Sequence, residues 1–128
     1  MKLVTAIIRP EKLDEIIDAV IASGGRGLTA TTVRGFGQQF GELAGHAAST
    51  DHAASTDTDT ARPPLYRRAV LLTKIRLDIV VLDRDVQAMV DAVAKHAHTG
   101  VIGDGKIWVS DVDSVLRVRT GEKDREAV

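Results

Sequence analysis

The sequence predicts a small α/β domain of the α+β type, in which two β-α-β units lie side by side with their helices on one sheet face. Short apolar runs rich in β-branched residues alternate along the chain with two stretches of helical periodicity. The chain has 128 residues, which is the length of one domain. Because β-α-β connections are right-handed as a rule, two such units form a ferredoxin-like sandwich.

The first unit begins at the start of the chain. Lys2–Ile8 is a short apolar run that predicts a buried strand, and Pro10 suits the first position of a helix. The apolar residues that follow recur at helical spacing, and they are Leu13, Ile16, Ile17, Val20 and Ile21. Gly24 and Gly25 are expected to end this helix. Residues 28–36 then predict a second strand, with threonines at several positions that favour it.

The second unit repeats this order. Residues 69–82 predict a third strand, and Asp83 is placed to cap a second helix. The apolar face of that helix consists of Val86, Met89, Val90 and Val93. Residues 106–109 predict a fourth strand and residues 114–118 a short fifth. Because the helices cover one face of the sheet, we expect further copies of the chain to cover the other.

Composition excludes several classes of protein. Aromatic residues make up 3% of the chain and hydrophobic residues 44%, so the core must be built from Val, Ile, Leu and Ala. A net charge of −1 gives no general attraction for nucleic acid. The absence of cysteine excludes disulfides, thiolate catalysis and Cys-based zinc sites. No run resembles a membrane span or a signal peptide, so we expect a cytoplasmic protein without direct membrane insertion.

Residues 38–68 separate the second and third strands and are predicted to form an extended mobile loop. A unit of sequence His-Ala-Ala-Ser-Thr-Asp occurs twice in succession, from His46 to Asp57. Small polar low-complexity sequence of this kind cannot build a core. The His and Asp residues also suggest a metal site or a pH sensor. A solvated loop is the simpler interpretation, because a flexible segment lacks the hydrogen bonds that orient metal ligands.

Residues 99–106 carry the most informative chemistry, in the order Thr-Gly-Val-Ile-Gly-Asp-Gly-Lys. Glycines allow a sharp bend and a close approach of the backbone to a ligand. Lys106 adds a charge to this bend, and Arg117 and Arg119 add forked cationic donors, a combination that suits a polyphosphate. The stretch is no P-loop, because a strand and not a helix follows Lys106. A glycine-rich hairpin with a solvated lysine is the alternative.

This stretch resembles the C-terminal signature of the PII signal-transduction family, the nitrogen-regulatory nucleotide sensors. Further family-like segments occur in the same order along nearly the whole chain outside residues 40–73, and they are residues 1–10, 12–15, 27–29, 33–39, 74–81 and 117–122. The resemblance implies a homotrimer of single domains that span residues 1–128. Residues 38–68 would form its large loop, the T-loop, and residues 113–128 its C-terminal loop and tail.

The resemblance also implies an adenine nucleotide, namely ATP, ADP or AMP, in clefts between neighbouring subunits. The glycine turn would wrap the phosphates, and the two arginines would hold them from the adjacent subunit. The loop base and Thr29 would pack around the base and ribose. The implied nucleotide-binding residues are Thr29, Gly35, Phe36, Gly37, Gln38, Gly103, Asp104, Gly105, Lys106, Arg117 and Arg119.

A second ligand implied by the resemblance is 2-oxoglutarate, bound together with Mg²⁺ that bridges the ATP phosphates. Gln39 would be the protein ligand of the metal, and Lys74 would pair with a carboxylate of the acid. The chain departs from the family pattern in its loop. Phe40 stands where a lysine is usual, and the tyrosine that many members have nucleotidylated is absent.

The sequence therefore predicts a non-enzymatic regulator that senses adenine nucleotides and controls a transporter or a metabolic enzyme through its loop. No arrangement of Ser, His and Asp or of paired carboxylates suggests catalysis. Two alternatives stay open. One is a carbon- or bicarbonate-linked PII-like regulator that senses adenylates without 2-oxoglutarate. The other is a metal-binding trimer that uses the histidine repeat.

Overall fold

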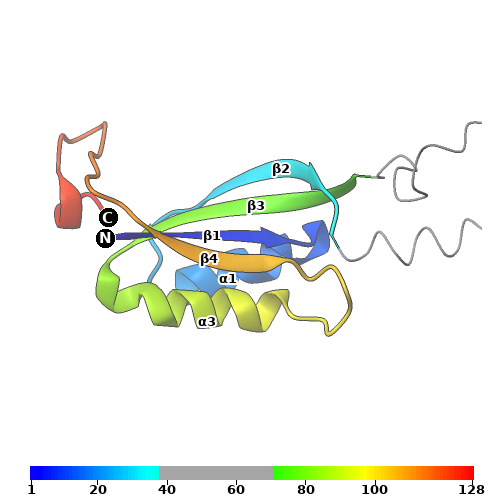
Figure 1. Ribbon diagram of the computed structural model, residues 1–128. Coiled ribbons are helices and arrows are strands. Elements are labelled where there is room, and N and C mark those ends of the chain that lie inside the picture. Colours follow the sequence, from blue (N-terminus) through cyan, green and yellow to red (C-terminus); the bar gives the residue numbers. More distant parts are fainter. Residues whose placement is uncertain (38–70) are drawn as a thin grey trace, which may run out of the picture.

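The computed structural model describes residues 1–37 and 71–128, which form a four-stranded antiparallel sheet with helices on one face (Figure 1). The elements are β1 (Lys2–Ile8), α1 (Leu13–Ala22), β2 (Thr29–Gly35), β3 (Leu72–Val81), α3 (Val86–Ala97) and β4 (Lys106–Asp111). The strand order is β2-β3-β1-β4, and every neighbouring pair is antiparallel. This is the ferredoxin-like arrangement that the sequence predicts, with α1 and α3 as the two connecting helices.

The core lies between the sheet and the two helices. Alternate residues of β1 and β3 face the helices, and there Val4, Leu77 and Ile79 are almost completely buried. The helices contribute Ile16, Val20, Met89 and Val93 to the same cluster. No aromatic side chain belongs to this cluster of the described residues, as the low aromatic content predicts. Aliphatic burial of this kind stabilises the fold by roughly 1.5–3 kcal/mol for each fully buried side chain.

The ends of the first unit follow the predictions. β1 begins and ends where the apolar run does, and Pro10 opens a short 3₁₀ helix before α1. Gly24 has a φ of 87°, a conformation that favours glycine. The amides of Gly24 and Gly25 donate to the carbonyls of Ile21 and Val20, at 3.0 and 2.9 Å, and these bonds close the helix.

The predicted cap at Asp83 is wrong. A 3₁₀ helix, Asp83–Asp85, precedes α3, and Asp85 occupies the N-cap position without a side-chain hydrogen bond. The carboxylate of Asp83 instead accepts a hydrogen bond from the Met1 nitrogen at 2.7 Å. Asp83 lies too early in the chain to cap α3, because the 3₁₀ helix intervenes.

The predicted fifth strand over residues 114–118 is also wrong. One isolated bridge joins Leu116 to Lys123, and the chain between them turns back on itself. The Gly121 amide donates to the Arg117 carbonyl at 2.8 Å, and the Arg117 guanidinium contacts the carboxylate of Glu122. Arg117 and Arg119 therefore do not share a strand face: Arg117 is half-buried and Arg119 is exposed. This segment, orange to red in Figure 1, extends beyond the end of the sheet near both termini.

The other face of the sheet carries no helix in the part of the chain that the structure describes (Figure 1). The pairing register places Thr5 of β1 between Asp78 and Trp108 on this face. The Thr5 side chain is buried, and its hydroxyl donates to the Asp78 carboxylate at 2.8 Å. Arg76 donates to the same carboxylate at 2.9 and 3.1 Å. Trp108 is 42% exposed, so the face combines a central polar cluster with accessible apolar surface.

Candidate functional site

The glycine-rich residues predicted to bind phosphates form the connection from α3 to β4. Three of its glycines adopt positive φ angles, 79° at Gly100, 106° at Gly103 and 98° at Gly105. Gly105 packs against the end of β1 so closely that a Cβ atom there would lie 1.7 Å from the carbonyl oxygen of Ile7. Only glycine satisfies both the φ angle and this contact. The close contact between the turn and the end of β1 therefore requires glycine at position 105.

Asp104 fastens the turn from within. Its carboxylate accepts hydrogen bonds from the amides of Thr99 and Gly100, at 2.7 and 2.9 Å, and from the Thr99 hydroxyl. The Nε atom of Arg9 donates to the same group at 3.0 Å. The Thr99 hydroxyl, followed by the Thr99 amide, holds the pKa of Asp104 well below its usual range. The ionised Asp104 carboxylate thus joins the beginning of the turn to its end through hydrogen bonds.

The Asp104→Asn variant should show what this ionised carboxylate contributes to stability. Because the carboxyl pKa is lower in the folded chain, its contribution is present above the unfolded pKa of 3.8 and is lost as the pH falls further. We expect the variant to be less stable than the wild-type protein at about pH 5 and above, with the difference narrowing below pH 4. Thermal unfolding of both proteins across this pH range measures the difference in stability. Asp113→Asn, which changes an exposed carboxylate, is the matched control. A stability difference between Asp104→Asn and the wild-type protein that does not change with pH would contradict the role of the ionised Asp104 carboxylate.

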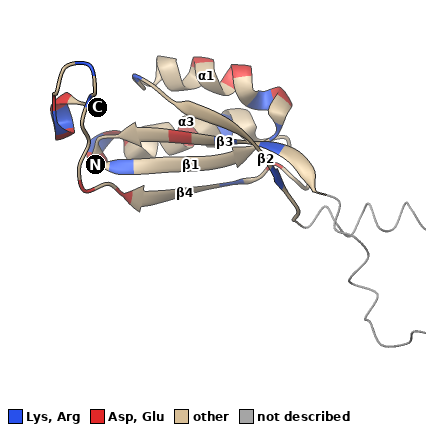
Figure 2. Ribbon diagram, turned by 90° about the horizontal axis from the view of Figure 1, so that it is seen from above, with Lys and Arg blue, Asp and Glu red and all other residues tan. Residues whose placement is uncertain are grey.

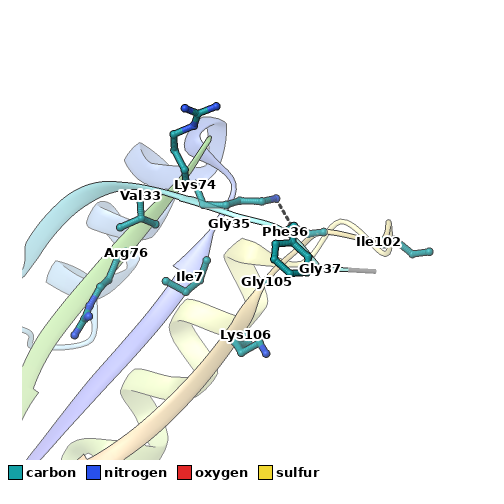
Figure 3. Close-up of a pocket in the computed structure, with 12 residues that line it drawn as sticks. Ile7, Val33, Gly35, Phe36, Gly37, Lys74, Arg76, Ile102, Gly105 and Lys106 are labelled. Atoms are coloured by element: carbon teal, nitrogen blue, oxygen red, sulfur yellow. Dashed lines mark hydrogen bonds between the residues drawn. The ribbon is translucent and has the colours of Figure 1, made fainter. Parts of the chain in front are cut away.

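A pocket of about 660 Å³ lies where this turn meets the ends of the central strands (Figure 3). Its lining is Ile7, Val33, Arg34, Gly35, Phe36, Gly37, Lys74, Arg76, Ile102, Gly103, Gly105 and Lys106. The four basic residues in this lining make the pocket suited to an anion. The acidic residues Asp14, Glu15 and Asp18 lie on α1 (red in Figure 2), on the other side of the sheet. We call this cavity the turn pocket.

Lys74 links the sheet to the glycine turn inside this pocket. Its Nζ atom donates to the carbonyl of Gly103 at 2.7 Å, the dashed line in Figure 3. Partial burial, followed by the neighbouring Arg9 charge, lowers the pKa of Lys74. The side chain predicted to pair with a carboxylate is thus engaged with the turn in this structure.

A second pocket of about 400 Å³ lies at the opposite end of β2 and β3. Its lining is Arg26, Gly27, Leu28, Thr29, Asp78, Val80, Val115, Arg117, Ala127 and Val128. We call it the tail pocket, because the last residues of the chain contribute to it. Thr29 and Arg117, two of the predicted nucleotide-binding residues, meet here.

The predicted site residues are therefore divided between two places. Gly35, Phe36, Gly37, Gly103, Gly105 and Lys106 line the turn pocket together with Lys74. Thr29 begins β2 and Gly35 ends it, and a strand of seven residues separates its ends by about 20 Å. Arg119 lines neither pocket, and Gln38 and Gln39 lie outside the described residues. On β3 the two linings adjoin, because Arg76 of the turn pocket donates to Asp78 of the tail pocket. The predicted residues at the two ends of β2, Thr29 and Gly35, nevertheless lie in different pockets.

The sequence analysis did not assign Arg76, Ile7 or Arg9 to the site. Arg76 lies two positions after the predicted residue Lys74 on β3, so strand alternation alone places both on one face. Ile7 could not be found in this way, because its place beside Lys106 depends on the pairing of β1 with β4. Arg9 gave no signal either, since its partner Asp104 is 95 positions away in the chain.

Comparisons with known proteins identify the family of this chain. A family model described as "Nitrogen regulatory protein P-II" matches residues 1–122. The chain belongs to the PII family. PII proteins are regulatory signal transducers rather than enzymes, so the expectation of a non-enzymatic regulator is confirmed at this level.

Three curated PII relatives illustrate the extent of the match. This chain is 45% identical to nitrogen regulatory protein P-II 2 of Methanothermobacter thermautotrophicus, over 100% of the chain and 97% of the relative. It is 44% identical to nitrogen regulatory protein P-II of Synechocystis, and the match covers both chains completely. It is 40% identical to nitrogen regulatory protein GlnK of Escherichia coli, again over the full length of both.

Two further expectations concern membranes and metals. Among the helices of residues 1–37 and 71–128, none is long and apolar enough to cross a membrane. The same residues contain no group of three or more His, Cys, Asp or Glu side chains that could hold a metal ion. Both copies of the histidine-containing repeat lie outside the described part of this PII chain, and so does the predicted loop over residues 38–68.

Proposed function

We propose that this PII chain is a regulator that binds an adenine nucleotide between neighbouring copies and thereby controls a transporter or a metabolic enzyme. PII proteins bind adenine nucleotides in general. The observation that carries the proposal is the division of the implied binding residues between the turn pocket and the tail pocket. In this proposal each pocket supplies part of a nucleotide site, the turn pocket on one half of the sheet and the tail pocket on the other.

The turn pocket is proposed to hold the phosphates. Backbone amides in a turn with positive φ angles form concave sites for anions. Lys106 lines the pocket next to these amides, and Arg34 and Arg76 add further positive charge. A volume of about 660 Å³ is within the usual range for small-molecule sites. Phe36, at 68% exposure, offers apolar surface at the same pocket.

The tail pocket of a second copy is proposed to complete the site. Arg117 would bring its guanidinium to the phosphates from that copy, and Thr29 would offer a hydroxyl to the ribose or base. A head-to-tail contact that closes on itself forms a ring, which agrees with the trimer implied by the family. The sheet face with Trp108 and Thr5 supplies accessible apolar surface for such a contact.

Residues 38–68 are proposed to respond to the nucleotide, because they begin directly after Gly37 at the turn pocket. A ligand shifts the conformations of such a segment only as far as its affinity for them differs. The target that recognises them would be a transporter or a metabolic enzyme in the cytoplasm. Gln39, the proposed ligand of Mg²⁺, belongs to this segment and lies outside the described residues.

Lys74 bears on whether adenylates are sensed with or without 2-oxoglutarate. Its Nζ atom uses one of three N–H groups on the Gly103 carbonyl, so a carboxylate at Lys74 would have to lie beside the glycine turn. Titration of 2-oxoglutarate into protein with and without MgATP separates the two versions. Binding heat from 2-oxoglutarate in the presence of MgATP supports the version with two ligands. No binding heat under the same conditions supports the version that senses adenylates alone.

Calorimetric titration with ATP, ADP and AMP tests the proposal itself. We expect at least one of them to bind, and Arg117→Ala to weaken binding by roughly 1.5–3 kcal/mol, the value of a charged hydrogen bond. Arg125→Ala removes an exposed cation from the same C-terminal segment and is the matched control. Absence of heat from all three nucleotides at millimolar concentration would contradict the proposal.

A further inference from the structure

Three successive carbonyl groups of the glycine turn are held by two basic side chains. The Nη2 atom of Arg9 donates to the carbonyls of Val101 and Ile102, at 3.3 and 2.9 Å. The Nζ atom of Lys74 takes the next carbonyl, that of Gly103, at 2.7 Å. The oxygens on this side of the turn are thus directed toward Arg9 and Lys74.

Fixing these carbonyls also fixes the amides that follow them. A trans peptide is planar, so the N–H of each next residue points away from the carbonyl oxygen of the same peptide. The amides of Ile102, Gly103 and Asp104 are therefore directed away from Arg9 and Lys74. A run of amides presented in this way is what an anion requires of a turn.

Arg9 also holds the other end of the turn. Its Nε atom donates to Asp104, whose carboxylate binds the amides of Thr99 and Gly100. Arg9 itself is fixed in place, because it stands between β1 and the Pro10 turn and its side chain is only 18% exposed. One side chain anchored to the central sheet thus contacts the middle of the turn and Asp104, and Asp104 in turn binds the beginning of the turn.

We infer that Arg9 is a positioning residue for phosphate binding. It does not line the turn pocket, and it acts by holding the 99–104 backbone in the conformation that presents its amides. The inference rests on the proposed nucleotide site for its functional meaning. The hold of Arg9 on the turn can be measured without any ligand.

The test compares Arg9→Met, Arg9→Lys and the wild-type protein in two measurements. Amide hydrogen exchange of Thr99 and Gly100, observed by NMR without ligand, reports the state of the turn. Calorimetry with ATP reports binding. For Arg9→Met we expect exchange at these amides to become about tenfold faster and ATP affinity to fall about tenfold, the effect of losing one charged hydrogen bond. Amide exchange in β1 and β3 should not change. Arg9→Lys should show smaller changes than Arg9→Met in both the exchange rate and the ATP affinity.

Arg84→Met is the matched control, because Arg84 is an exposed cation in the 3₁₀ helix before α3, at the end of α3 away from the turn. It should change neither measurement. Unchanged exchange in Arg9→Met would overturn the inference, and so would a fall in affinity without faster exchange, since Arg9 would then act on the ligand directly. If Arg9→Met does not fold, the same two measurements are made on Arg9→Gln, for which we expect the same changes. Absence of ATP binding by the wild-type protein would refute the proposed function, while the exchange data would still decide whether Arg9 holds the turn.

Discussion

Mixing chains that carry Lys106→Ala with chains that carry Arg117→Ala should restore the tight ATP binding that neither variant shows alone. Lys106 lines the turn pocket and Arg117 the tail pocket, on different halves of the sheet. Each variant alone should bind more weakly by roughly 1.5–3 kcal/mol, because every site lacks one charged partner. In a mixed ring, about one interface joins an intact turn pocket to an intact tail pocket. Co-expression with two affinity tags isolates the mixed oligomer, and calorimetry measures its tight sites.

The control for this experiment replaces the second chain by one that carries both substitutions. Every turn pocket then lacks Lys106, so no interface is complete and no tight binding should return. Sedimentation of the wild-type chain gives the size of the oligomer in the same buffer. A mixture that binds no better than its separate components, or a chain that sediments as a monomer, would mean that the site does not form between copies.

The regular elements could be predicted from the sequence because their patterns are local. The apolar run of β1 predicts a buried strand and the helical spacing from Leu13 to Val20 predicts an amphipathic helix, and the structure confirms both. The same reasoning failed for residues 114–118. An alternating pattern indicates a strand only where another strand pairs with it, and this segment has only the bridge from Leu116 to Lys123. Turn hydrogen bonds at Gly121 satisfy its backbone instead.

The candidate site was predictable in its residue types but not in its arrangement. The glycines and Lys106 predict a turn suited to phosphate, because their chemistry is local to the segment. The contact between Asp104 and Arg9 could not be predicted in this way, because it depends on the order of strands that places β1 next to β4. The separation of Thr29 from Gly35 likewise becomes a constraint only once β2 is known to extend from the tail pocket to the turn pocket. Sequence patterns identify such groups, and the tertiary fold decides which of them meet.

Gly105→Ala should be the most damaging single substitution in the turn. The new Cβ would lie 1.7 Å from the Ile7 carbonyl oxygen and 2.7 Å from its carbon, and the φ angle of 98° is strained for any other residue. Ile7 cannot retreat easily, because β1 is paired on both sides, with Arg76 of β3 and with Lys106 of β4. The turn must therefore move away from the sheet. We expect a loss of about 2–5 kcal/mol in unfolding free energy from overpacking and backbone strain together.

Gly100→Ala separates these two causes. Gly100 also has a positive φ, 79°, but the nearest atoms to its added Cβ would be those of the His98 ring at 3.8 and 3.9 Å, an ordinary contact. This variant should lose only the strain energy, about 1–2 kcal/mol. Denaturant unfolding at one fixed protein concentration compares the two variants, because an oligomer's stability depends on concentration. ATP affinity should fall beyond detection in Gly105→Ala and much less in Gly100→Ala, since only the first displaces the turn from Ile7. Equal losses in both variants would mean that the contact with β1 does not position the turn.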